Sequence, residues 1–227
     1  MESEQHLLIS IINIILIDLI LGGDNAVVIA LACRRLPEKQ RNKAIILGTG
    51  LAVVIRISLI AIMVSLLKIP YLLLIGGIFL VYIALKLVIE KGDDLNIKAG
   101  HSLFSAVRTI VLADVVMGLD NVLGIAGASH GNLSLVLIGI LISVPIIIWG
   151  SKIILTAMEY MPALIYIGSA VLAYTASGMV LEEPKLSGIL ADYPQIKMPL
   201  TIFLIAGVLL VGWLVNRSKS EDANHHI

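Results

Sequence analysis

The apolar residues of this 227-residue chain form long unbroken blocks that are separated by short polar segments. A helix that crosses the hydrocarbon core of a bilayer, about 30 Å thick, needs about 20 mostly apolar residues. Seven blocks have roughly this length: residues 7–33, 43–67, 70–90, 102–129, 133–157, 162–181 and 199–216. Because they lack the alternation typical of a barrel strand, they predict an all-α polytopic membrane protein, with seven transmembrane helices in a single domain, 1–227.

Composition and charge agree with this prediction and exclude one class of partner. Apolar residues make up 59% of the chain and charged residues 14%, against about 45–50% and about 25% in an ordinary soluble domain. Sixteen basic residues balance sixteen acidic ones, so we expect no nucleic-acid partner. No basic cluster precedes the first block and no small-residue cleavage site follows it, so we expect this block to remain as a helix in the bilayer.

The polar segments differ in their basic residues, and this difference predicts the orientation. Lys and Arg gather in 34–43, in 90–98 and after 216, whereas the segments on the other side hold only Lys68, Lys185 and Lys197. Basic loops stay in the cytoplasm. We therefore expect a protein of the plasma membrane with its N-terminus outside and its C-terminus inside. The polar tail from Ser218 onward is expected to be unstructured.

One acidic motif occurs twice, at a separation of 96 positions. Residues 18–32 read DLILGGDNAVVIALA and residues 114–128 read DVVMGLDNVLGIAGA, and seven of the fifteen positions are identical. Farther along, Gly76 and Tyr82 match Gly168 and Tyr174 at a separation of 92. The pattern predicts a three-helix unit that is used twice, over about 7–90 and 102–181, with an additional helix over about 199–216.

A repeat with three membrane helices must insert its second copy upside down, because each copy ends on the side opposite its start. Inverted repeats are a recurrent plan of secondary transporters, whose substrate site lies near the midplane where broken helices meet. The aspartates of the motif lie on the first helix of each repeat, close to glycines at which we expect these helices to break: Gly22, Gly23 and Gly118.

The duplicated motif D-x-x-x-G-x-D-N, at 18–25 and 114–121, resembles the TerC family of integral membrane proteins, in particular its manganese-exporter branch. The resemblance covers nearly the whole chain. It implies export of divalent metal ions, chiefly Mn²⁺. It also implies that the acidic residues of the family correspond to Asp18, Asp24, Asp114 and Asp120.

The chemistry of these side chains favours a cation site. An ionised side chain at the bilayer centre costs about 2.5–3.5 kcal/mol on insertion scales, so the aspartates must face one another, water or a cation. Carboxylate and amide oxygens suit Mg²⁺, Ca²⁺ or Mn²⁺, and neither motif contains the His or Cys that softer metals prefer. We expect the ligands to be Asp18, Asp24, Asn25, Asp114, Asp120 and Asn121. A polar network between helices is the structural alternative, and the two asparagines could instead cap the broken helices.

Two basic residues inside predicted helices could balance part of this charge. Arg56 lies well within the second helix, and its repeat mate Lys152 lies within the fifth. If both faced four ionised aspartates, the remaining charge of −2 would match one divalent cation. Lys152 could instead extend its amine to the membrane interface.

Three functions compete for this sequence. The first is a secondary transporter that exports Mn²⁺ in exchange for protons, without ATP as the direct drive because no G-x-x-x-x-G-K-[ST] loop occurs. The second is an intramembrane aspartyl protease, in which two aspartates share a proton. The third is a non-transporting partner of the secretion machinery. Four repeat-related aspartates exceed the need of a protease, so we expect a transporter and not an enzyme. The sequence is compatible with a homo-oligomer but does not predict one.

Overall fold

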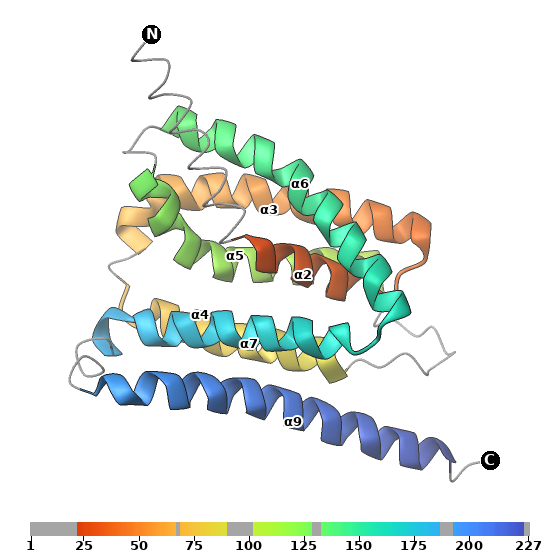
Figure 1. Cartoon of the computed structure of the whole chain (residues 1–227). Helices are drawn as coiled ribbons and strands as arrows, with labels where there is room; N and C mark the ends of the chain where they lie inside the picture. Colours follow the sequence, from red (N-terminus) through yellow and green to blue (C-terminus); the bar gives the residue numbers. More distant parts are fainter. Residues whose placement is uncertain (1–21, 67–68, 90–101, 129–132, 187–192, 225–227) are drawn as a thin grey trace. The chain divides into compact units, whose positions relative to one another are not determined.

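A computed structural model of the chain describes residues 22–66, 69–89, 102–128, 133–186 and 193–224, and every regular element in these ranges is helical (Figure 1). The elements are α2 (Gly23–Cys33), α3 (Glu38–Leu66), α4 (Leu72–Ile89), α5 (Leu103–Ala128), α6 (Leu133–Tyr160), α7 (Leu164–Glu182), the 3₁₀ helix η1 (Pro194–Ile196) and α9 (Lys197–Asn224).

Five of the described helices are long and apolar enough to cross a membrane: α3, α4, α6, α7 and α9. The chain is therefore an all-α membrane protein that crosses the bilayer several times. The predicted block 102–129 corresponds to α5, and α2 covers only the last part of block 7–33, most of which lies outside the described residues. A total of seven spans stays a prediction.

Two helices extend by five or more residues beyond the predicted apolar blocks. The helix α3 begins at Glu38 and not near residue 43, and the carbonyl of Pro37 accepts the N–H groups of Gln40 and Arg41 at 2.8 Å each. At the other end, the expectation of an unstructured tail from Ser218 is wrong, because α9 continues to Asn224. The reason is local: the polar residues after Ser218 include Lys, Glu and Ala, which favour helix even without a core to pack against.

The described helices gather in two compact units, one containing α2, α3, α5 and α6 up to Ala157, and the other α4, α7, η1 and α9. In the first unit α3 packs along α5, and Gly48 permits this close approach: a Cβ there would lie 2.8 Å from Cδ1 of Ile110. This packing sets α3 and α5 side by side, with α2 against both.

In the second unit α4 and α7 pack closely, and α9 contacts both. A Cβ on Gly77 of α4 would lie 2.8 Å from the carbonyl oxygen of Ala176 on α7, so the two backbones approach directly. On α9, the amide of Asn216 donates to the carbonyl of Val88 and to the hydroxyl of Tyr166, both at 3.0 Å.

A buried glutamate ties the end of α7 to the start of α4. Glu183 lies in a segment that the polar pattern assigns to a loop, yet it is only 1% exposed. Its carboxylate accepts the N–H of Tyr71 at 2.9 Å and of Leu73 at 3.2 Å. These bonds satisfy donors that the first turn of a helix leaves without an intrahelical acceptor. The start of α4 and the end of α7 therefore lie at the same end of this unit.

Candidate functional site

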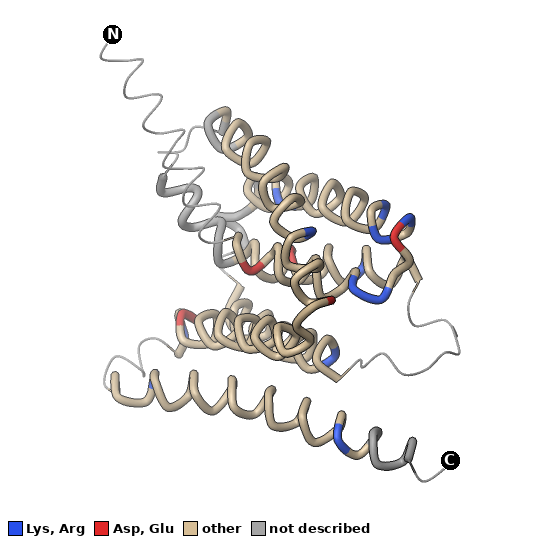
Figure 2. The backbone as a smooth tube through the Cα atoms, turned by 45° about the vertical axis from the view of Figure 1, so that its right-hand side comes forward, with Lys and Arg blue, Asp and Glu red and all other residues tan. Residues whose placement is uncertain are grey.

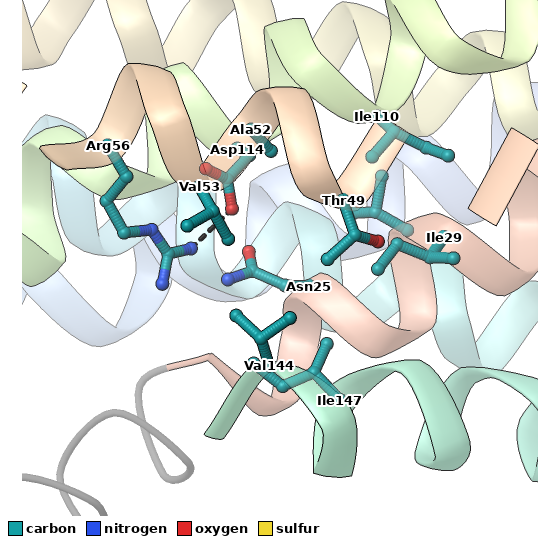
Figure 3. A pocket seen from close by; sticks show the side chains of 11 residues that line it. Asn25, Ile29, Thr49, Ala52, Val53, Arg56, Ile110, Asp114, Val144 and Ile147 are labelled. Carbon is teal, nitrogen blue, oxygen red and sulfur yellow. Dashed lines mark hydrogen bonds and ion pairs between the residues drawn. The ribbon is translucent and has the colours of Figure 1, made fainter. Parts of the chain in front are cut away.

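A cavity in the first unit is lined by residues from α2, α3, α5 and α6 (Figure 3). It measures about 370 Å³, including the part that opens outward. Most of the lining is alanine or branched aliphatic residues. The lining side chains that carry polar groups are Asn25, Thr49, Arg56 and Asp114, which are between 3% and 9% exposed.

Charged residues are unusual at such a position in this fold. Figure 2 shows that Lys, Arg, Asp and Glu lie mostly near the ends of the described helices, and only a few lie along their middle. Arg56 lies within α3 and Asp114 within α5, away from the helix ends. Both side chains are buried.

Arg56 and Asp114 form an ion pair in this cavity. The Nη2 of Arg56 donates to the Oδ1 of Asp114, as the dashed line in Figure 3 marks. Removing one member of a buried pair costs about 3–5 kcal/mol, because the other charge then stays buried without a partner. Separating the two side chains therefore costs free energy unless another ion replaces one of them.

Asn25 brings an amide to the same place. It lies in the first turn of α2, where its backbone N–H donates to the carbonyl of Gly22 at 3.1 Å. Figure 3 shows its side chain turned toward Arg56 and Asp114. Within the part of the chain that the structure describes, neither its Oδ1 nor its Nδ2 has a hydrogen-bond partner. A buried amide without partners is costly, and it leaves both groups available to a ligand or to a moving neighbour.

Thr49 on α3 is a site residue that the sequence analysis missed. It lies farther along the same cavity, is 5% exposed, and its hydroxyl has no hydrogen-bond partner among the described residues. The signal was present as the run Gly48-Thr49-Gly50 in an otherwise apolar helix. A single threonine in a membrane helix usually bonds to its own backbone, so the residue type alone carried little information.

The predicted ligands are only partly brought together. Asn25 and Asp114 line the cavity, whereas Asp24 is half-buried in the first turn of α2 and does not line it. Asp18 lies outside the described residues, and the side chains of Asp120 and Asn121 on α5 are also outside the description. Of the two predicted balancing cations, Arg56 is buried in the cavity and Lys152 is exposed on α6.

The glycines fall into two cases. The helix α2 begins at Gly23, with Gly22 outside the helix at φ −102° and ψ 4°. The residues before Gly22 lie outside the description, so the break expected at Gly22 and Gly23 stays a prediction. The break expected at Gly118 does not occur, because α5 runs without interruption from Leu103 to Ala128. A single glycine costs a helix only about 1 kcal/mol relative to alanine, and the packing of α5 along α3 outweighs this cost.

The described side chains give only part of a set of metal ligands. Among the residues that the structure describes, no group of three or more His, Cys, Asp or Glu could hold a metal ion. The cavity offers one carboxylate, one amide oxygen and one hydroxyl, which are ligands suited to hard divalent cations.

Comparison with known proteins identifies the family of the chain. The family model described as "Integral membrane protein TerC family" matches residues 3–220. The chain belongs to the TerC family. This TerC-family chain is 55% identical over 209 residues to the "Uncharacterized membrane protein YjbE" of Bacillus subtilis (strain 168), which covers 92% of the chain and 96% of the relative.

The names of two more distant relatives describe them as inner membrane proteins. The "UPF0053 inner membrane protein YoaE" of Escherichia coli (strain K12) is 28% identical over 192 residues, which cover 76% of this chain and 37% of that protein. The "UPF0053 inner membrane protein YgdQ" of the same strain is 26% identical over 186 residues, covering 74% and 78%. No solved structure matches the chain.

Proposed function

We propose that this TerC-family protein is a secondary transporter that exports divalent metal ions, with Mn²⁺ as the principal cargo. The observation that carries the proposal is the buried Arg56–Asp114 pair beside the amide of Asn25, which has no partner among the described residues. Burying two charges and a bare amide stabilises a fold poorly, whereas a cation pathway requires such groups in the membrane interior.

In this proposal the cargo binds to oxygen ligands from both copies of the motif, with protons as the exchanged ion. Asp114 and Asn25 supply the part of the site that lies in the cavity, and Asp18, Asp24, Asp120 and Asn121 complete it. The choice of Mn²⁺ comes from the family resemblance together with the hard-oxygen character of the ligands.

The competing protease function receives less support from the cavity. An aspartyl protease needs two carboxylates that share one proton. Among the described residues that line the cavity, Asp114 supplies the one carboxylate, and it forms an ion pair with the guanidinium of Arg56.

The helix directions within each unit are compatible with the inverted-repeat plan that we propose. In the first unit Gly48 lies against Ile110, and Arg56 pairs with Asp114 farther along, so α3 and α5 run in the same direction. In the second unit Glu183 reaches Tyr71, so α4 and α7 run in opposite directions. Both relations are those expected of helices 2 and 4, and of helices 3 and 6, in a chain whose consecutive helices cross the bilayer in alternating directions.

Labelling of single cysteines with a membrane-impermeant reagent tests this orientation. We expect a cysteine at Glu38 to react only from the cytoplasmic side and one at Lys185 only from outside, because basic loops stay inside. A cysteine at Ser3 should behave like the one at Lys185. Reaction of the cysteines at Ser3 and Glu38 from the same side would contradict the topology.

The function itself is tested by the cellular content of Mn. Cells that lack the protein are expected to accumulate several-fold more Mn than cells that express it when both grow in excess Mn²⁺, because the export route is gone. Mg and Zn contents measured in the same samples report selectivity. Equal Mn contents with and without the protein would argue against export.

A further inference from the structure

The carboxylate of Asp114, a proposed metal ligand, already has a cationic partner in Arg56. The Oδ1 of Asp114, one of the proposed ligand atoms, accepts a hydrogen bond from Arg56. A guanidinium and a metal ion are both cations, and neither tolerates the other within contact distance in a medium of low dielectric constant. A cation that binds to the Oδ1 of Asp114 therefore takes the place that the guanidinium of Arg56 now occupies.

The pair also contributes to the charge of the site without cargo. Arg56 and Asp114 together are neutral, and the other polar groups that line the cavity among the described residues, those of Asn25 and Thr49, carry no charge. With the exchanged protons on Asp18, Asp24 and Asp120, the metal-free site can open to the other side without moving net charge through the bilayer. If Arg56 were absent, Asp114 would lose the cation that faces it in the cavity, and an ionised side chain in the membrane interior costs a few kcal/mol.

We propose that Arg56 is a tethered counter-ion: its guanidinium occupies Asp114 when the cavity is empty and moves aside when a divalent cation binds. This inference rests on the proposed export function and deepens it, because it states which cation faces Asp114 while the metal-free carrier returns with protons on the other aspartates. Arg56 then acts as a positioning residue that sets the affinity for cargo and permits the return step, without being a ligand itself.

Asn25 is placed to serve both states. Figure 3 shows its amide directed toward the pair, and its Oδ1 has no hydrogen-bond partner among the described residues. An amide oxygen can accept an N–H from a displaced guanidinium or coordinate a hard cation. The groups needed for either arrangement are thus present at the same place.

The second repeat offers a matched control. Lys152 is the repeat mate of Arg56, but its side chain is exposed on α6 and does not line the cavity. If Arg56 acted only through the total charge of the protein, neutralising Lys152 would have the same effect. The tethered counter-ion predicts different outcomes for the two positions.

The test uses the purified full-length protein in vesicles, with ⁵⁴Mn²⁺ as the probe, and compares the wild type with Arg56→Gln, Arg56→Lys and Lys152→Gln. Three quantities are measured: Mn²⁺ affinity, exchange of ⁵⁴Mn²⁺ for Mn²⁺ across the membrane, and net Mn²⁺ movement. Exchange needs only the loaded carrier, whereas net movement also needs the empty carrier to return. This difference separates the counter-ion from a merely structural role.

We expect Arg56→Gln to bind Mn²⁺ about tenfold more tightly, because a competing charge has been removed. Exchange should stay within about threefold of the wild type, while net movement falls at least about tenfold, because Asp114 has lost the guanidinium that faces it during return. Arg56→Lys should keep net movement, because an ammonium also neutralises Asp114. Lys152→Gln should match the wild type in all three measurements.

Two results would overturn the proposal while leaving export intact. One is an Arg56→Gln variant that loses affinity, or whose exchange and net movement fall equally. The other is an Arg56→Lys variant that folds and exchanges ⁵⁴Mn²⁺ but shows no net Mn²⁺ movement. This result would overturn the proposal even if Arg56→Gln does not fold. A wild-type protein that neither binds nor moves Mn²⁺ would overturn the proposed function and this inference together.

Discussion

Mn²⁺ export is expected to stop when Asp114 is replaced by asparagine, with a loss of at least about a hundredfold in rate, equivalent to about 2.7 kcal/mol. The substitution keeps the size of the side chain but removes the carboxylate that the cavity presents to a cation. It also removes the carboxylate that pairs with the guanidinium of Arg56, a residue only 3% exposed. Both effects act against binding of a second cation in the same cavity.

Loss of export in Asp114→Asn could reflect instability alone, so a second variant is needed. An unpaired buried charge destabilises a protein by about 3–5 kcal/mol, whereas removing both members of the pair can be nearly neutral. We therefore expect Asp114→Asn combined with Arg56→Gln to recover the thermal stability of the wild type in detergent but not its export. Export by this double variant at a normal rate would show that Asp114 is not a ligand.

The helices were predictable because the bilayer imposes a length on apolar blocks that no other environment imposes. The predicted blocks 70–90 and 162–181 differ from α4 and α7 by no more than two residues at either end. The boundaries failed where no such constraint operates. The polar starts and ends of α3 and α9 continue as helix outside the apolar blocks, which hydropathy cannot detect.

The candidate site was predictable in part, and for a physical reason. Arg56, Asp114 and Asn25 were singled out because charged and amide groups inside apolar blocks require a partner, and the structure brings these three together. Thr49 and Glu183 were missed because their importance depends on tertiary burial. The break at Gly118 was wrong because glycine permits a break in a helix but does not force one.

The grouping of the helices could not be read from the pattern at all. Apolar blocks in a membrane are hydrophobic on every side, so periodicity does not indicate which helix packs against which. The structure pairs the third helices of the two predicted repeats, α4 and α7, through the close approach at Gly77, and it packs α3 along α5 through Gly48. Small residues at these contacts are the only trace that this packing leaves in the sequence.

The duplicated motif leads to the second large effect: Asp24→Ala and Asp120→Ala should each abolish Mn²⁺ export while leaving insertion into the membrane intact. Each substitution takes a carboxylate, and hence both a ligand and a charge, from the proposed oxygen site. Asp24 lies in the first turn of α2, where an acidic side chain stabilises a helix by about 0.3–1 kcal/mol. Losing this contribution alone would not prevent folding, so a large loss of export at a normal level of inserted protein would reflect the site.

The comparison between the two variants is the sharper part of this prediction. If the repeats are inverted copies that meet at one site, Asp24 and Asp120 are equivalent, and the two losses should be of similar size. Glu159→Ala serves as the control, because this acidic residue is exposed near the end of α6 and belongs to neither motif. The measurement is ⁵⁴Mn²⁺ efflux normalised to the amount of protein in the membrane fraction. Export at the wild-type rate in either aspartate variant would show that this aspartate is not a ligand. The duplication of the motif would then have to reflect a role in folding alone.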